Sequence, residues 1–281
     1  MSRLLYSGFR RYFKSHLFWL ALAGAIVIGV LSGVSVRNRY VLDDWLIIVG
    51  FLVYAVLLSL MIGREFGDGA FRNKIISGHT KGKIFVSEYI VALTTCLILC
   101  AITAVVFALL NISLFQRIAM ELVAKAIVGF ILFVISFITI TVSLCMLIAH
   151  RVVMVVVAIL LVVSSCIISY TIDDKLDRPE FVQQVQAVDG ELSVESTMEK
   201  NPGYIDSPLR EQYTTIVRLI PYGQIIHYMK MAEPLFDPQN VSLVMTDEYA
   251  ATLNVMPVYS VGTILMFYAI GFWGFKRKPI R

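Results

Sequence analysis

The sequence predicts an all-α polytopic membrane protein with six transmembrane helices, an N-terminal amphipathic interfacial helix and an extracellular insertion between spans five and six. Three observations support this fold class. Of the 281 residues, 58% are hydrophobic and only 16% are charged, whereas soluble domains are nearer half apolar and a quarter charged. The apolar residues form six long stretches, and most of the basic residues lie next to alternate ends of these stretches.

The six stretches are long enough to cross a bilayer. A helix needs about 20 apolar residues to cross a hydrocarbon core of about 30 Å, because every backbone polar group must be satisfied within the segment. The candidates are Leu17–Val36, Trp45–Ile62, Ile84–Leu110, Ala126–Ala149, Val152–Ile172 and Val258–Phe275. The chain then divides into residues 1–172 with the amphipathic helix and five spans, residues 173–256 with the insertion, and residues 257–281 with the sixth span and a basic tail.

Residues 1–16 predict a helix that lies on the membrane surface. Its apolar and basic residues recur on opposite sides at helical spacing, the pattern of an interfacial amphipathic helix. The apolar side holds Leu4, Leu5, Phe9, Tyr12 and Phe13, and the basic side holds Arg3, Arg10, Arg11 and Lys14. The alternative is that these residues form the first turns of the first span.

The distribution of basic residues predicts the orientation. Lys and Arg collect in the N-terminal segment, in the loop of residues 63–83 and in the C-terminal tail, which by the positive-inside rule puts both termini in the cytoplasm. Residues 173–256 contain fourteen acidic and six basic residues. A long segment of this kind crosses the membrane largely regardless of its charge, so it is expected outside.

The insertion contains signals for a hairpin and for helices. Asp189-Gly190 lies between Phe181–Val188 and Glu191–Ser196, and an Asp-Gly pair at such a position predicts a hairpin turn. Ser207 followed by Pro208 predicts an N-cap with proline at the first helical position. Helical spacing then continues over residues 208–232. Within it, the apolar stretch Pro221–Met231 is too short for a span and predicts a helix in the outer leaflet.

The loop of residues 63–83 is basic, contains several glycines and predicts a short amphipathic helix from about Gly69 to Ser77. Asp68 is placed to cap its N-terminus and Gly78 to end it. Its apolar residues are Phe71, Ile75 and Ile76, and the basic residues Arg72 and Lys74 flank them. Such a helix suits a groove on a partner protein. The alternative is a solvated loop that only serves the positive-inside rule.

Glu88 is the one acidic or basic residue in the six stretches. It lies about one turn into the third span, close enough to the cytoplasmic interface for its carboxylate to form an ion pair. The candidate partners are Arg64, Arg72, Lys81 and Lys83. A proton-relay role is the alternative, because intramembrane ionisable groups are often functional.

The chain has no nucleotide-binding loop of its own. The nearest approach, Gly78–Ile84, has one residue too few between its glycines and places Ile84 where Ser or Thr would contact magnesium. The four histidines are scattered without metal-ligand spacing. We therefore expect no catalytic, cofactor-binding or metal-binding residue here, and no nucleic-acid partner.

At the loop of residues 63–83 the sequence resembles the permease subunits of type-2 ATP-binding-cassette (ABC) exporters. The matching positions are Glu65, Gly69, Arg72, Asn73, Lys74 and Gly78. Two positions depart from the family pattern, since Ala70 replaces the usual threonine and Ser77-Gly78 replaces a proline near the turn. The six spans, the cytoplasmic termini, the amphipathic helix and the outer-leaflet helices extend the resemblance along the whole chain.

The resemblance implies an assembly of two permeases and two cytoplasmic ABC ATPase subunits in a bacterial plasma membrane, with ATP and Mg bound by the ATPases. The second permease would be the same chain or a related one. The implied coupling helix comprises Phe71, Arg72, Asn73, Lys74 and Ile75, with Glu65 preceding it. Spans two and five would line the substrate path, which nominates Tyr54, Ser59, Ser164, Ser165 and Ser169. The implied substrate is a hydrophobic or amphipathic molecule: a peptide, a lipid-like molecule or a drug.

Two other functions remain open from the sequence. One is a non-transporting component for peptide immunity or sensing, because the acidic residues 173–256 would attract cationic peptides. The other is an intramembrane enzyme, which would need convergent nucleophilic or ionisable groups within the spans. The sequence offers only Glu88 for that purpose.

Overall fold

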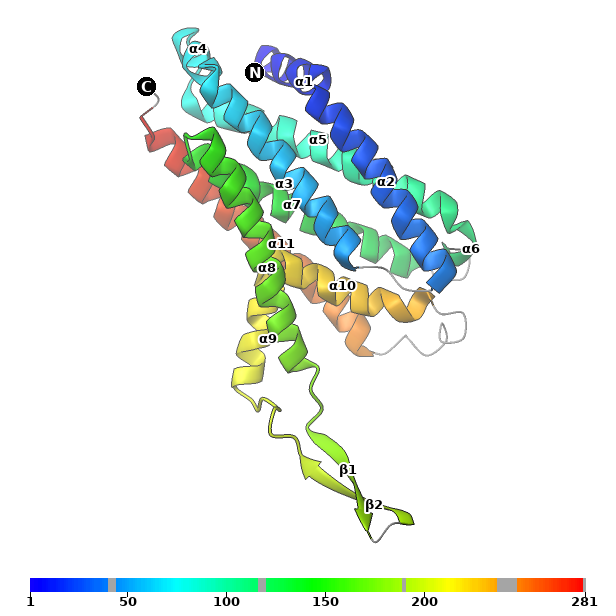
Figure 1. Ribbon diagram of the computed structural model, residues 1–281. Coiled ribbons are helices and arrows are strands. Elements are labelled where there is room, and N and C mark those ends of the chain that lie inside the picture. Colours follow the sequence, from blue (N-terminus) through cyan, green and yellow to red (C-terminus); the bar gives the residue numbers. More distant parts are fainter. Residues whose placement is uncertain (40–43, 116–119, 189–190, 237–246, 280–281) are drawn as a thin grey trace.

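The computed structural model describes residues 1–39, 44–115, 120–188, 191–236 and 247–279, and in these parts it is a helical membrane protein with one β-hairpin (Figure 1). Six of the described helices are long and apolar enough to cross a membrane. They are α2 (His16–Arg39), α3 (Asp44–Gly67), α5 (Lys81–Leu110), α7 (Met120–Leu147), α8 (Arg151–Leu176) and α11 (Asp247–Arg277). The predicted fold class and the six spans are confirmed. The start of α11 extends ten residues into the predicted insertion, with Pro257 inside the helix.

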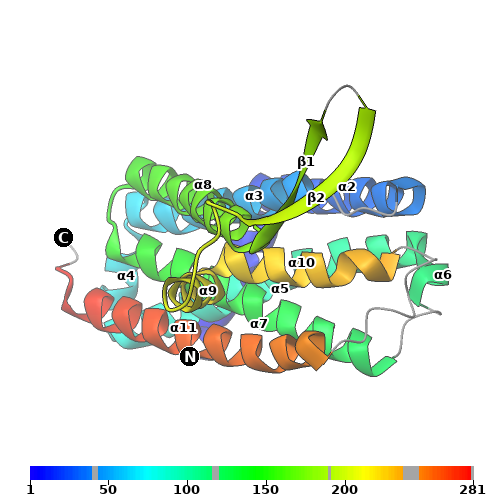
Figure 2. The ribbon, with the colours of Figure 1, turned by 90° about the horizontal axis from the view of Figure 1, so that it is seen from below.

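The spans pack in two layers. Figure 2 shows α2, α3 and α8 side by side, with α7 and α11 on the other side of the bundle. Across the layers α2 packs on α5 and α3 on α7, while α7 also packs along α11. The centre is aromatic: the ring of Phe51 on α3 lies 4.9 Å from that of Phe133 and 4.8 Å from that of Phe137, both on α7.

The N-terminal residues form a separate helix, α1 (Ser2–Lys14), as predicted. Ser15 has an extended backbone with ψ 132° and separates α1 from α2. The buried stripe of α1, which contains Leu4, Gly8 and Tyr12, packs against α5. A Cβ atom on Gly8 would lie 2.8 Å from Cγ2 of Val91, so the glycine allows this close approach.

Small residues on α2 face α5. A Cβ atom on Gly29 would lie 2.9 Å from the backbone oxygen of Thr103, and the Thr103 hydroxyl donates a 3.1 Å hydrogen bond to the carbonyl of Ala25. One turn beyond Gly29, the amide of Asn111 donates a 3.2 Å bond to the carbonyl of Gly33. The spacing of small residues at positions 25, 29 and 33 therefore corresponds to a close helix contact, as small-residue strips do in membrane proteins.

The insertion begins with an antiparallel hairpin of β1 (Phe181–Val188) and β2 (Glu191–Lys200), which projects from the helices in Figure 1. The predicted strands are confirmed, β2 runs four residues further than expected, and the predicted turn at residues 189–190 lies outside the described residues. In the described part of the hairpin, Phe181 pairs with Lys200, and the regular pairing continues to Gln186 with Glu195.

Two helices follow the hairpin, α9 (Leu209–Leu219) and α10 (Pro221–Phe236). They are not one continuous helix, because Ile220 is extended with ψ 125° and a residue before proline disfavours helical backbone. The expected cap at Ser207 is also wrong: Pro208 occupies the N-cap position without a side-chain bond. The Ser207 hydroxyl instead donates a 3.3 Å bond to the carboxylate of Glu211.

Polar contacts fix α9 and α10 to the end of α8. Lys230 of α10 pairs with Asp173 at 2.7 Å and also with Asp177. Arg210 of α9 donates a 2.6 Å bond to the carbonyl of Leu176. These helices thus pack on the spans at the end of the bundle from which the hairpin projects.

Candidate functional site

The candidate site lies at the opposite end, around the short helix α4 (Ala70–Ile76). Gly69 at its N-cap has φ 66°, a conformation that favours glycine. No side chain caps this end, so the cap expected from Asp68 is absent. At the other end Gly78 has φ 86°, and His79 donates its amide to the carbonyl of Lys74 at 3.1 Å, which is a glycine-dependent helix stop. The two glycines thus fix the length of α4.

The two faces of α4 point to different surroundings. Phe71 is only 1% exposed and lies within the bundle, whereas Arg72, Asn73 and Ile76 are exposed. The apolar face expected from the sequence is therefore divided, because Phe71 packs inward and Ile76 points outward. Ile75 is partly buried beside the core.

Aromatic rings hold the inner face of α4. The Phe71 ring lies 4.3 Å from that of Phe66 at the end of α3 and 5.8 Å from that of Phe275 at the end of α11. Phe275 in turn lies 6.1 Å from Phe85 at the start of α5. This aromatic cluster joins four helices at one end of the bundle, and a displacement of α4 would require it to repack.

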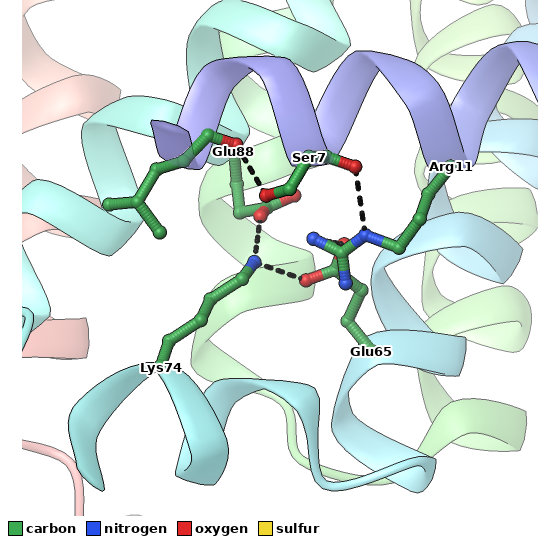
Figure 3. A network of polar contacts seen from close by, with 6 residues as sticks. Ser7, Arg11, Glu65, Lys74 and Glu88 are labelled. Carbon is green, nitrogen blue, oxygen red and sulfur yellow. Dashed lines mark hydrogen bonds and ion pairs between the residues drawn. The ribbon is translucent and has the colours of Figure 1, made fainter. Parts of the chain in front are cut away.

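An ion network binds the same inner side of α4 through Lys74 (Figure 3). The ammonium group of Lys74 pairs with Glu65 at 2.6 Å and with Glu88. Glu65 also pairs with Arg11 of α1 at 2.9 Å, and Arg11 donates a 3.2 Å bond to the carbonyl of Ser7. Two cations and two carboxylates thus connect α1, α3, α4 and α5 in a network that is neutral as a whole.

The partner of Glu88 differs from the expectation. The structure pairs it with Lys74, and none of the four cations considered from the sequence occupies that place: Arg64, Arg72 and Lys83 are exposed, and Lys81 donates to the carbonyl of Lys278 at 2.5 Å. Sequence reasoning did not consider Lys74 as a partner of Glu88, because it treated Lys74 as a residue flanking the apolar face of the short helix. Its three-residue spacing from Phe71, which puts both on one side of a helix, was the available signal.

The C-terminal segment closes the site. Lys278 donates a 3.1 Å bond to the carbonyl of Met146 at the end of α7, and its ammonium group lies 4.3 Å from the centroid of the Phe66 ring. Burial lowers the pKa of Lys278 from 10.5 to about 8. The segment after α11 is therefore part of the assembly that surrounds α4.

The five residues nominated for a substrate path do not share one surface. Tyr54 and Ser59 of α3 and Ser169 of α8 are buried, while Ser164 is exposed and Ser165 is partly buried. The Tyr54 hydroxyl hydrogen bonds with the Thr103 hydroxyl at 3.3 Å, so it faces α5. The assignment of a path to these residues stays a prediction.

Within residues 1–39, 44–115, 120–188, 191–236 and 247–279, no group of three or more His, Cys, Asp or Glu residues could hold a metal ion. The buried carboxylates of the site, Glu65 and Glu88, are each paired with a cation. No protein family, curated protein or solved structure matches this chain.

Proposed function

We propose that this chain is the membrane-spanning permease subunit of a type-2 ABC exporter. ATP hydrolysed by a separate pair of cytoplasmic subunits would drive it, and a second permease, identical or related, would complete the transporter. The substrate class is a hydrophobic or amphipathic molecule such as a peptide, a lipid-like molecule or a drug. The protein itself would carry out no chemistry.

One observation carries the proposal: one face of α4 is held by three helices, and its other face is exposed and could bind a partner. A soluble ATPase can shift the conformational equilibrium of a membrane protein only through an element whose contacts with the ATPase differ between the two conformations. That element must also move the spans. Phe71 and Lys74 link α4 to α3, α5 and α11, while Arg72, Asn73 and Ile76 point outward.

The orientation belongs to the same proposal. The end of the bundle with α4 also has the N-terminus, the described end of α11 and α1 beside it (Figure 1). This end is rich in Lys and Arg, so the positive-inside rule assigns it to the cytoplasm, where a nucleotide-driven partner would be available. The hairpin and α9 would then lie outside the cell.

The test is purification of the tagged full-length chain from its native cells in mild detergent. We expect a subunit with a nucleotide-binding loop to co-purify, identified by mass spectrometry, and the complex to hydrolyse ATP. The variant Ile76→Asp should release this subunit while the chain still inserts and elutes as a folded protein. Ile76 is chosen because its exposed side chain contributes little to the fold.

The matched control is Met198→Asp on the hairpin, where an apolar side chain that is 67% exposed receives the same change at the other end of the molecule. It should leave the complex intact. Absence of any ATPase from the wild-type preparation, or release by Met198→Asp as readily as by Ile76→Asp, would reject the proposed function.

A second function, peptide sensing without transport, is favoured by the hairpin. β1 and β2 project from the bundle (Figure 1), and β2 carries Glu191, Glu195 and Glu199. This arrangement would attract cationic peptides. Replacement of residues 181–200 by a short linker should then abolish binding of a cationic peptide to the purified chain, and retained binding would rule this function out.

A further inference from the structure

The outward face of α4 presents one apolar side chain among polar ones. Ile76 is 73% exposed, the largest value among the large apolar side chains of the described residues. Arg72 and Asn73 precede it by four and three residues and so lie on the same side of the helix. A single exposed isoleucine is ordinary on a protein surface. The charges around it therefore decide what this face can bind.

These charges are mostly positive. Within residues 63–83, Arg64, Arg72 and Lys83 are exposed, and the exposed carboxylate is that of Asp68. Lys276 and Arg277 at the end of α11 are exposed as well. The ion network does not change this balance, because it buries Glu65 together with Lys74. The exposed part of the loop therefore keeps the excess of positive charge that its sequence indicates.

An anionic membrane and an acidic protein are the two candidate partners for such a surface. The residues suited to the lipid interface lie on α1 and the start of α2, where Tyr6, Lys14 and Trp19 are exposed. By contrast, α4 lies at the extreme end of the molecule, beyond α1 (Figure 1). The field of anionic headgroups decays within a Debye length of about 10 Å. These positions favour a protein partner for α4.

We infer that α4 binds an acidic groove on its partner, in which Asp or Glu carboxylates pair with Arg72 and its neighbouring cations around an apolar pocket for Ile76. The inference rests on the proposed function and specifies the surface of the ATPase subunit that this function requires. A guanidinium group is suited to this role because it can bind a carboxylate through two parallel hydrogen bonds. Pairing of this kind also makes the association dependent on ionic strength.

The experiment uses the full-length chain in nanodiscs of phosphatidylcholine and the purified ATPase subunit identified by co-purification. We expect the Kd to rise about tenfold or more between 50 and 500 mM NaCl, because screening shortens the reach of surface charges. At 50 mM NaCl, Arg72→Glu should raise the Kd about tenfold. Arg72→Lys, which keeps the charge but not the two parallel hydrogen bonds, should recover part of the affinity. The matched control is Lys14→Glu on α1, which should leave the Kd unchanged.

The outcomes separate this inference from the proposed function. If Ile76→Asp releases the ATPase while salt and Arg72→Glu have no effect, the acidic groove is wrong and the proposed function stands. If no ATPase binds at any salt concentration, both are wrong. If Arg72→Glu leaves the Kd unchanged but reduces the phosphatidylglycerol that co-purifies with the chain, the cations face lipid and the inference is overturned.

Discussion

The ammonium group of Lys74 lies 2.6 Å from a carboxylate oxygen of Glu65, and this pair joins the middle of α4 to the last turns of α3. Both side chains are almost completely buried. Lys74 also pairs with Glu88 on α5, so one cation separates two carboxylates in a region of low dielectric constant. The position of α4 relative to two spans depends on this side chain.

Substitution of Lys74 by Met should lower the free energy of unfolding by about 3 kcal/mol, because removing one partner of a buried ion pair leaves uncompensated charge. Thermal or denaturant unfolding of the purified chain in detergent measures this change. The triple variant Lys74→Met, Glu65→Gln, Glu88→Gln should recover part of the loss. Arg72→Met, on the exposed face, should change stability by less than about 0.5 kcal/mol, and an equal loss there would contradict the assignment of Lys74 to the interior.

Phe71→Ala should destabilise the protein by about 3 kcal/mol, since it removes a buried ring from contact with Phe66 and Phe275. Ile76→Ala, five residues further along α4 and on its exposed face, should have almost no effect on unfolding. The same measurement in detergent compares the two variants. If Ile76→Ala were the more destabilising of the pair, the two faces of α4 would be reversed.

Gly29→Ala and Gly24→Ala form a matched pair on α2. Both add one methyl group and the same gain in helix propensity, but at Gly29 the new Cβ would lie 2.9 Å from the backbone oxygen of Thr103, whereas at Gly24 nothing lies within 4 Å. We expect Gly29→Ala to be less stable than Gly24→Ala by about 1–2 kcal/mol. Equal melting temperatures would show that α2 and α5 can separate without cost.

The stability of the chain should depend on pH through Lys278, whose pKa is lowered by burial to about 8 from 10.5. Between these values the unfolded chain binds more protons than the folded chain, so the free energy of unfolding rises with pH across this window. Below about pH 8 the side chain is charged in both states and its burial opposes folding in full. The rise should be small because the side chain is partly exposed.

Unfolding of the wild type, Lys278→Met and Lys276→Met between pH 7.5 and 10 tests this dependence. Lys278→Met should flatten the rise, while Lys276→Met at the neighbouring exposed position should retain it. A rise that persists unchanged in Lys278→Met would have another origin.

The spans, the hairpin strands and the bounds of α4 could be predicted because each depends on local pattern. Apolar length predicts a span, an Asp-Gly pair between alternating residues predicts the strands, and Gly78 predicts the end of α4. Two turns of helix, however, do not reveal which side faces the bundle, since both sides of α4 carry an apolar residue. That choice depends on the rings at positions 66 and 275, which come from distant parts of the sequence.

The partner of Glu88 depends on long-range packing in the same way. Residues 65, 74 and 88 belong to three helices, and their side chains meet only after α3 and α5 have packed together with α4 at their junction. Lys81 and Lys83 are nearer to Glu88 in the sequence than Lys74 is. The sequence alone does not show how one helix is rotated against another. The break at Ile220, in contrast, follows from Pro221 by a local rule and was predictable in principle.

The length of α8 has a mechanical consequence. Its 26 residues measure about 39 Å at 1.5 Å per residue, more than the thickness of a hydrocarbon core, and its end is joined to α9 and α10 before the hairpin begins. A small tilt of this rod within the bilayer would therefore swing the distal strands through a much larger arc. A spectroscopic label at Met198 would amplify rearrangements that are too slight to detect between the spans themselves.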